Sequence, residues 1–359
     1  MKIKAMLSKR FAMFVTLVSL CAFSTSAYAE YNLRFSELGP PRGARAESLQ
    51  WWADEITKRT DGEVKVEFFW SQALAKGKDN LRAVGTGLAD VGTIMGIYNP
   101  AEVPVWSYGN VPFVAGDSWV TLRTWQELHR TMPELMDEMK NNNVRILINY
   151  TTGPSDLLTK FPLNTAEDLQ GKKIRATGSY MNLLSTLGAV PVNTGFGEVY
   201  QAMDRGTVDG AAIYMFAVRS YKLYEVGSHV VEVNMGQVPG YGAGINLDLW
   251  NSMPENIRQI ITEVSEEFID HYGEALIKDI DDSRAELAAG IDGKALTITT
   301  LDPAEREKWK AAAEPLLDEW KKRVTDKGLD PEKIIEQVNA VEAKYEKELA
   351  EKGYPWTRN

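Results

Sequence analysis

The stretch that decides the fold is residues 171–211, which read GKKIRATGSYMNLLSTLGAVPVNTGFGEVYQAMDRGTVDGA. Its pattern predicts a short strand that contains Arg175, then a helix, then a return to the same sheet. A guanidinium group is always charged, and its planar set of donors fits a carboxylate. A half-buried Arg175 therefore needs an anion, which is either a ligand or one of the 50 Asp and Glu residues of the chain.

Strands and helices also alternate in the rest of the chain. Residues 31–35 and 64–68 show the alternation of strands, and the apolar stripe over 49–56 between them has the spacing of a helix. This order predicts a parallel sheet covered by helices. The segments LRAVGTGLADVG (81–92) and YQAMDRGTVDGA (200–211) share Ala, Gly and Asp at the same spacing. Similar units in two halves of a chain too long for one core favour two α/β domains.

The C-terminal third is predicted to be helical. From Pro254 to Gly290 apolar residues recur at helical spacing. At ~1.5 Å per residue this helix could reach about 50 Å, so we expect it to lie along both domains. Residues 302–324 and 330–349 predict two more amphipathic helices, whose charges we interpret as a solvated face.

Residues 1–29 have the features of a cleavable secretion signal. A basic start is followed by an apolar run over 11–23 and by a small-residue cleavage site, AYA, before Glu30. The run is shorter than the roughly 20 residues that a membrane span needs. We therefore expect an exported, soluble chain in the periplasm. The only cysteine, Cys21, lies in the signal, so the mature chain has no thiol for a disulfide, a metal or a nucleophile.

Charge and composition exclude several classes of function. The formal net charge of −10 becomes −14 without the four basic residues of the signal, so nucleic acid and anionic membranes are poor partners. The three histidines, His129, His229 and His271, lie far apart and lack the spacing of metal ligands. The sequence shows no nucleophile elbow, phosphate loop or dinucleotide-binding fingerprint. It thus predicts neither a cofactor nor catalysis.

Loops at the carboxyl ends of strands are the first place to look for a ligand in such a protein. The pattern predicts four of them, at residues 37–42, 70–78, 95–100 and 151–156. Several aromatic side chains lie in these loops or near other strand ends. Apolar walls with a few polar groups and one arginine describe a site for a small molecule.

Five segments then occur in a telling order: GEVKVEFFWSQAL, VGTGLADVG, LQGKKIRATGSYMNLLSTLGAVPV, FGEVYQAMDRGTVDGA and LYEVGSHV. In this order they resemble the solute-binding proteins of tripartite ATP-independent periplasmic (TRAP) transporters, over essentially the whole mature chain. The resemblance implies the two-domain α/β fold of a periplasmic binding protein, with hinge strands and a long helix that spans both domains. It also implies one small organic acid as ligand, the small and large membrane subunits of a TRAP transporter as partners, and a monomer.

The resemblance further implies domain boundaries and site residues. After the signal at 1–29, we expect domain I at 30–152 plus 241–280, and domain II with the C-terminal helices at 153–240 plus 281–359. Arg175 matches the family's arginine that pairs with the ligand carboxylate, and Phe196 matches a pocket aromatic. The candidate ligand-binding residues are Arg175, Glu37, Trp70, Met95, Tyr98, Ser155, Asp156, Asn193, Phe196, Tyr214 and Phe216.

The sequence departs from the family pattern at one informative place. Many relatives carry a second arginine before a Leu-Thr pair, whereas Ser155 and Asp156 stand before Leu157, Leu158 and Thr159 in this chain. A monocarboxylate with an apolar or hydroxylated body is therefore favoured over a dicarboxylate or an acidic sugar. Three alternatives stay open: a small amine or amino alcohol that uses Asp156, a secreted enzyme, and a sensor subunit that presents the same ligand to a membrane receptor.

Overall fold

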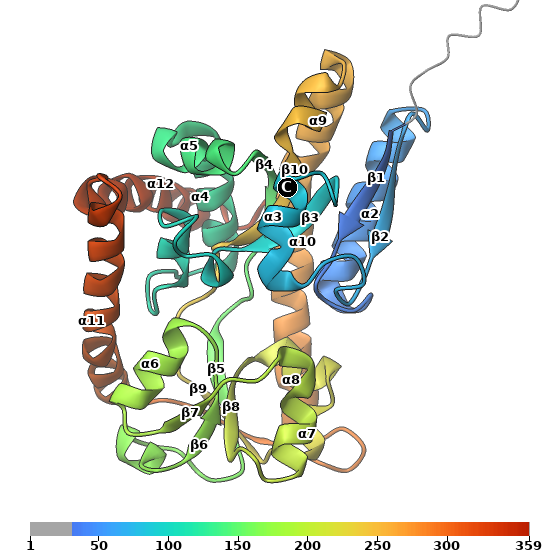
Figure 1. The fold of residues 1–359 in the computed structure, drawn as a ribbon. Coiled ribbons are helices and arrows are strands. Elements are labelled where there is room, and N and C mark those ends of the chain that lie inside the picture. The colour runs from blue at the N-terminus through green and yellow to red at the C-terminus, as the bar shows by residue number, and fades with distance from the viewer. Residues whose placement is uncertain (1–30, 359) are drawn as a thin grey trace, which may run out of the picture.

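The computed structural model describes residues 31–358, and the predicted signal with Cys21 lies outside them. Within this range the chain forms two α/β lobes, each built around its own sheet, as predicted (Figure 1). We call the part with the five-stranded sheet the first lobe and the part with the six-stranded sheet the second lobe. In Figure 1 the first lobe lies above the second.

The first lobe combines the N-terminal third of the chain with one strand from much later. Its strands are β1 (Tyr31–Ser36), β2 (Val64–Phe69), β3 (Val91–Met95), β4 (Val144–Asn149) and β10 (Tyr241–Asn246). Its helices are α2 (Gly43–Arg59), α3 (Asn80–Gly85), α4 (Ser118–Thr131), α5 (Pro133–Asn141) and α9 (Leu247–Ser252). The strand order is β2-β1-β3-β10-β4, and β10 runs antiparallel to both of its neighbours. The predicted stripe of α2 is buried, with Leu49, Trp52 and Ile56 in one core with Phe35.

The second lobe contains residues 171–211, with Arg175. Its strands are β5 (Ser155–Thr159), β6 (Lys173–Arg175), β7 (Val190–Val192), β8 (Gly210–Tyr214), β9 (His229–Glu232) and β11 (Thr297–Thr300), in the order β11-β9-β5-β8-β6-β7. Its helices are α6 (Ser179–Thr186), α7 (Val199–Asp204) and α8 (Met215–Ser220). The predicted strand with Arg175, helix and return to the sheet are confirmed as β6, α6 and β7.

Short 3-10 helices mark several of the connecting loops. They are η1 (Gly77–Asp79), η2 (Gly96–Tyr98), η3 (Trp106–Asn110), η4 (Ala166–Leu169), η5 (Phe196–Glu198), η6 (Leu223–Glu225) and η7 (Pro355–Thr357). Two of them contain candidate ligand residues. The helix η2 directly follows β3 and contains Tyr98, and η5 follows the loop after β7 and contains Phe196.

Two segments connect the lobes, one after β4 and one before β10. They are tied to each other because Thr151 donates a hydrogen bond from Oγ1 to Gln237 Oε1 over 2.8 Å. The long helix α10 (Glu255–Ala289) joins them, since the Tyr272 hydroxyl donates to the Thr151 carbonyl over 2.7 Å. This helix packs against α2 and α4 of the first lobe and α8 of the second, so its predicted position along both domains is confirmed.

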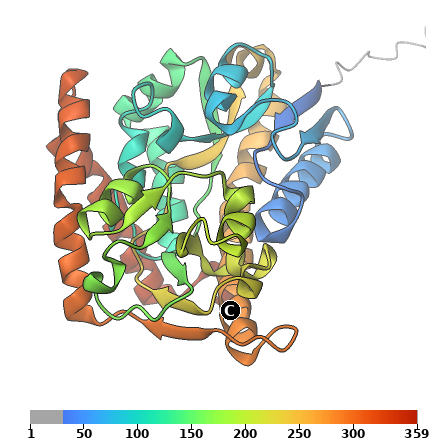
Figure 2. The ribbon, with the colours of Figure 1, turned by 60° about the horizontal axis from the view of Figure 1, so that its bottom comes forward.

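The last two helices, α11 (Pro303–Asp326) and α12 (Pro331–Lys352), also connect the lobes. Trp309 of α11 is buried in the core of the second lobe, whereas Trp320, three turns later, is buried in the first. Figure 2 shows α11 along one side of the molecule and α2 on the opposite side. The helix α12 packs on α4 of the first lobe, although the sequence grouped the C-terminal helices with domain II. The apolar pattern of α11 and α12 predicts that each helix packs on a core, but it does not indicate which of the two lobes provides that core.

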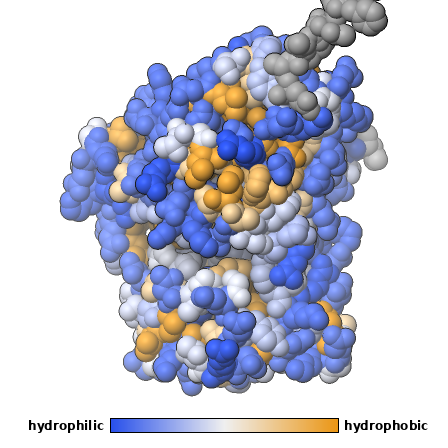
Figure 3. All heavy atoms as spheres, turned by 45° about the vertical axis from the view of Figure 1, so that its right-hand side comes forward, coloured by the Kyte–Doolittle hydropathy of each residue, from blue (hydrophilic) through white to orange (hydrophobic). Residues whose placement is uncertain are grey.

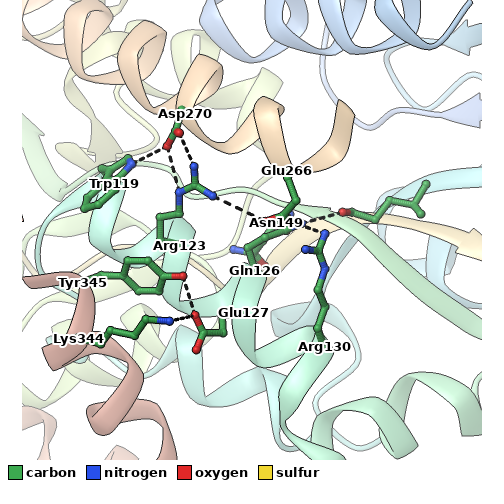
Figure 4. A network of polar contacts seen from close by, with 11 residues as sticks. Trp119, Arg123, Gln126, Glu127, Arg130, Asn149, Glu266, Asp270, Lys344 and Tyr345 are labelled. Carbon is green, nitrogen blue, oxygen red and sulfur yellow. Dashed lines mark hydrogen bonds and ion pairs between the residues drawn. The ribbon is translucent and has the colours of Figure 1, made fainter. Parts of the chain in front are cut away.

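A polar network holds α4 to α10 and α12 (Figure 4). Asp270 of α10 pairs with Arg123 and accepts a hydrogen bond from the Trp119 indole over 2.7 Å. Glu127 of α4 accepts bonds from Lys344 over 2.5 Å and from the Tyr345 hydroxyl over 2.6 Å. Positive and negative groups balance within it, so the network explains helix attachment and leaves no charge for a ligand.

The surface is unevenly apolar. On the face that Figure 3 shows, the largest group of apolar side chains lies in the upper part, which belongs to the first lobe. Polar side chains cover most of the rest of that face. None of the helices between residues 31 and 358 has both the length and the apolarity required to cross a membrane.

Candidate functional site

Arg175 lies at the end of β6, in the interior of the second sheet. Its backbone pairs with Val192 of β7 and Ala211 of β8, and Arg175 is only 5 % exposed. The guanidinium donates from Nε to the Thr194 carbonyl over 3.1 Å and from Nη1 to the Ala212 carbonyl over 3.4 Å. Burial lowers the pKa of Arg175 from its usual value, but a guanidinium stays protonated.

No carboxylate between residues 31 and 358 forms an ion pair with Arg175. The groups that act on its charge are the phenols of Tyr214 and Tyr98. Because a buried charge without a counter-charge is costly, with a penalty of about several kcal/mol per ion, an anion is the natural complement of this group.

An aromatic row extends from Arg175 along the second lobe. The Arg175 Cζ atom lies 5.4 Å from the ring centroid of Phe196 in η5. Phe196 stacks with Tyr214 at 6.2 Å between centroids, and Tyr214 stacks with Phe216 at 5.8 Å. Three of the predicted site residues therefore form one continuous wall beside the arginine, of the kind that lines small-molecule sites.

Ser155 and Tyr214 lie side by side in this wall. They are partners in the register of β5 and β8, so their side chains share one face of the sheet. Burial raises the pKa of Tyr214, and the charge of Arg175 and the hydroxyls of Thr152 and Ser155 oppose that rise. The phenol of Tyr214 is thus placed between Arg175 and Ser155.

The first lobe contributes the loop that follows β3. Tyr98 in η2 is 44 % exposed and close enough to Arg175 for its charge to oppose the rise in the Tyr98 pKa that burial causes. Met95 packs against the cores of both lobes. Ile97 lies over Gly178 of the second lobe, and Ser179 donates a hydrogen bond to the Asn110 carbonyl over 2.5 Å. The two lobes therefore meet next to Arg175.

Glu37 has its own partner in the first lobe. It is fully buried and forms an ion pair with Arg45 of α2, with 2.5 Å between Oε1 and Nη1. The same carboxylate accepts bonds from the Gly39 backbone over 2.8 Å and from the Thr93 hydroxyl. Burial lowers the pKa of Arg45, but the charge of Glu37 together with Tyr241, Tyr150 and Tyr272 raises that pKa above its usual value. The carboxylate is therefore already neutralised within the protein.

Asp156 faces away from the wall. It pairs with Ile213, so strand alternation places it on the face of the sheet opposite to Ser155 and Tyr214, a face to which Arg175, the partner of Ala211, also belongs. Its Oδ1 accepts a hydrogen bond from the Asn234 backbone over 2.9 Å. Burial raises the pKa of Asp156 to about 7.

The other two candidates lie apart from the wall. Trp70 stacks on Phe68 at 4.8 Å and packs against the core of the first lobe. Asn193 is exposed, just after β7. The structure thus brings together Arg175, Phe196, Tyr214, Phe216, Ser155 and Tyr98, with Met95 near them, and joins neither Trp70 nor Asn193 to this group by a contact.

Sequence reasoning missed three residues around this site. Arg45 lies in α2, and the apolar pattern of that helix does not indicate that Arg45 pairs with Glu37, the residue after β1. Tyr180, at the start of α6, is buried with Tyr214 and Ser155 as neighbours. Tyr221 packs edge-on against Phe196 at 4.9 Å and stacks under Arg42 of the first lobe at 4.7 Å. These contacts join distant segments, so no local pattern marks them.

The cavity beside the connecting segments is not lined by the predicted site residues. It has a volume of about 470 Å³ and also borders α10; its wall includes Asp117, Pro154, Gln237, Ile280 and Tyr354. In the described part of the chain, no group of three or more His, Cys, Asp or Glu side chains is placed to hold a metal ion.

The fold is that of a two-domain solute-binding protein. The family model described as "Bacterial extracellular solute-binding protein, family 7" (DctP) matches residues 35–323. The chain therefore belongs to this family, and the resemblance to TRAP solute-binding proteins is confirmed.

Curated relatives and solved structures agree with this assignment. The C4-dicarboxylate-binding periplasmic protein DctP of Rhodobacter capsulatus is 26 % identical over 318 residues, which cover 86 % of this chain and 92 % of that protein. A TRAP periplasmic solute-binding protein from Desulfovibrio salexigens, solved as an open complex, has a TM-score of 0.78 at 25 % identity and covers 89 % of this chain and 97 % of its own. A TRAP solute-binding protein from Rhodoferax ferrireducens, solved with benzoate, has a TM-score of 0.76 at 23 % identity, with coverages of 88 % and 98 %.

Proposed function

We propose that this protein binds a small organic acid with a single carboxylate between its lobes and delivers it to the membrane subunits of a TRAP transporter in the periplasm. The observation that carries the proposal is the buried guanidinium of Arg175, which has carbonyl and aromatic neighbours but no carboxylate partner in residues 31–358. A ligand carboxylate would supply the missing charge and accept two parallel hydrogen bonds.

The surroundings of Arg175 support one carboxylate rather than two. The wall next to it consists of neutral side chains, namely Ser155, Phe196, Tyr214 and Phe216. Two arginines of the first lobe lie in this region: Arg45 is already paired with Glu37, and Arg42 lies over the ring of Tyr221. A second ligand carboxylate would therefore be desolvated without compensation. The aromatic wall favours a ligand with an apolar body.

Relatives support the coarser class of ligand. Their names and descriptions mention C4-dicarboxylate, sialic acid, benzoate and D-glucuronate, all of which are organic acids of different shape. Such variety fits a family in which the wall around one arginine sets the choice of acid. The secretion signal at 1–29, cleaved before Glu30, remains our prediction for how the chain reaches the periplasm.

Two other candidate functions have weaker support. An amine ligand would need Asp156, whose carboxylate accepts a bond from the Asn234 backbone on the opposite face of β5. An enzyme would need a reactive group, and the polar groups beside Arg175 are hydroxyls without a base. Stoichiometric binding without turnover would separate a carrier from an enzyme.

A thermal-shift panel tests the proposed ligand class. The purified protein is screened with hydroxylated and aromatic monoacids, succinate, and small amino alcohols. A ligand that binds only the folded state at 100 times its Kd adds about 2.7 kcal/mol of stability, which is easily detected. We expect the largest shifts from monoacids. Tight binding of succinate or of an amino alcohol, with no response to monoacids, would contradict the proposal.

A further inference from the structure

We infer that Tyr180, Tyr214 and Ser155 form an uncharged subsite beside Arg175 that recognises a hydroxyl group carried by the ligand near its carboxylate. We call these three residues the hydroxyl subsite. The inference rests on the proposed function and makes it more specific, since it selects hydroxy monoacids among small carboxylates.

The first observation is that Tyr180 has a buried hydroxyl without a partner. Tyr180 lies in the first turn of α6 and is 4 % exposed. Its hydroxyl oxygen is buried and has no hydrogen bond of good geometry in residues 31–358, although the Ser155 hydroxyl lies close enough to lower its pKa. A buried hydroxyl that leaves water without replacing its hydrogen bonds is unfavourable, and native proteins rarely tolerate one without a reason. A group from outside the chain is the simplest partner.

The second observation is the position of this hydroxyl. Ser155, which is 2 % exposed, acts on both phenols, because its hydroxyl opposes the burial-driven rise in the pKa of Tyr180 and of Tyr214. Tyr214 in turn is close enough to feel the charge of Arg175. Ser155 and Tyr214 are partners in the register of β5 and β8, and the Ser155 hydroxyl also lies near that of Tyr180 at the start of α6. The Thr194 hydroxyl is another of those that have no hydrogen-bond partner within residues 31–358, and it belongs to the residue whose carbonyl accepts the Arg175 Nε bond.

The third observation concerns charge. Tyrosine and serine hydroxyls are neutral at physiological pH, and burial moves the pKa of both tyrosines further above it. Neutral hydroxyls can both donate to and accept from a ligand hydroxyl. They cannot neutralise a second carboxylate or an ammonium group, and Asp156, whose charge acts on Tyr180, is engaged with the Asn234 backbone. A hydroxyl is therefore the ligand group that best matches this subsite.

Matched pairs of acids test the inference by titration calorimetry. Each pair differs by one hydroxyl: lactate against propionate, mandelate against phenylacetate, and 3-hydroxybenzoate against benzoate. The chain is compared with Tyr180→Phe, Tyr214→Phe and Ser155→Ala. Tyr224→Phe is the matched control, because Tyr224 is another buried tyrosine of the second lobe, whose hydroxyl bonds to Asp292 over 3.3 Å.

We expect the unmodified protein to bind the hydroxylated member of at least one pair about 10-fold more tightly or better. Tyr180→Phe should bring that ratio close to one while leaving the affinity for the plain acid nearly unchanged, and Tyr224→Phe should preserve the ratio. Equal affinities for the two acids of every pair would overturn the inference. An affinity ratio that is unchanged in Tyr180→Phe would also overturn it, because the partner of the Tyr180 hydroxyl would then be water rather than the ligand.

The outcomes separate this inference from the proposed function. If both members of each pair bind equally and Arg175→Met abolishes both, the hydroxyl subsite is wrong and the carboxylate site stands. If no acid binds, or if Arg175→Met binds acids as before, both are wrong. Thermal unfolding of each variant checks folding, and Ser155→Ala, the smallest change, replaces Tyr180→Phe in the comparison if the latter does not fold.

Discussion

Two buried arginines in this protein show how the partner of a charge decides its role. Arg45 faces Glu37 at 2.5 Å, so its charge is used inside the first lobe. Arg175 has two backbone carbonyls and the face of Phe196 around it. A carbonyl dipole offsets only part of the cost of burying a charge, whereas a carboxylate offsets most of it when the geometry is good. This difference is the reason why we propose Arg175 as the arginine that binds the ligand.

The buried carboxyl group of Asp156 leads to a prediction about how the stability of the fold depends on pH. Its pKa of about 7, raised by burial from an ordinary value near 3.8, means that the folded chain holds the proton more tightly than the unfolded chain. The contribution of Asp156 to the free energy of unfolding is therefore fully present below pH 4 and is lost as the pH rises to about 7. Asp156→Asn keeps the acceptor for the Asn234 backbone and removes the titration.

We expect Asp156→Asn to gain stability relative to the unmodified protein between pH 4 and 7, at about 1.4 kcal/mol per pH unit or less. Above pH 7 the gain should stay constant. Urea unfolding at pH 4, 5.5, 7 and 8 measures it. If the two unfolding free energies differ by the same amount at every pH, Asp156 is not a buried titrating group.

At the scale of elements, the contact between η2 and the start of α6 holds the lobes together next to Arg175. Gly178 has φ of +57°, and a Cβ atom placed on it would lie 2.1 Å from the Cδ1 atom of Ile97. Gly178→Ala therefore strains the backbone and pushes the two lobes apart at this point. Gly206 is the matched control, because its φ is +69° and an added Cβ would meet nothing within 4 Å.

Gly206→Ala should destabilise the protein by about 1 kcal/mol through the backbone, and Gly178→Ala by more, because φ of +57° with ψ of −138° is accessible to glycine almost alone. Gly178→Ala should in addition weaken ligand binding at least several-fold, because it opposes the approach of the lobes, while Gly206→Ala should leave affinity unchanged. Calorimetric titration with the best acid of the panel provides the measurement. Equal affinities for the two variants would show that closure at Gly178 does not contribute to binding.

The elements also show what the sequence could and could not predict. Periodicity gave β6, α6, β7 and the long α10, because each has a local pattern of apolar residues. The strand alternation that places Ser155 and Asp156 on opposite faces was also readable, once β5 was known to pair with β8. Partners that come from distant segments were not readable. The pairing of Glu37 with Arg45 and the packing of α12 on α4 depend on the assembled fold.

On the scale of the whole molecule, the proposed site lies where the two lobes meet, and residues of both lobes contribute to it. The second lobe supplies Arg175 and the aromatic wall, and the first supplies Tyr98 and Ile97. Helices α10 and α11 and the two connecting segments join the lobes on other sides. A ligand held by both lobes would be shielded from water, and its ion pair with Arg175 would gain strength in the drier environment. Binding and closure are expected to be coupled for this reason.

The most direct test of this account is the affinity of Arg175→Lys for the best monoacid, measured by titration calorimetry beside Arg145→Lys. Arg145 is a half-buried arginine of the first lobe that stacks on Trp250 at 4.9 Å, so it controls for the exchange itself. Lysine keeps the charge at 175 but loses the two-pronged geometry, and charged hydrogen bonds contribute ~1.5–3 kcal/mol each. We predict a loss of about 10- to 100-fold for Arg175→Lys and none for Arg145→Lys. Unchanged affinity in a folded Arg175→Lys protein would contradict the account, because Arg175 would then be a structural residue rather than the partner of the ligand.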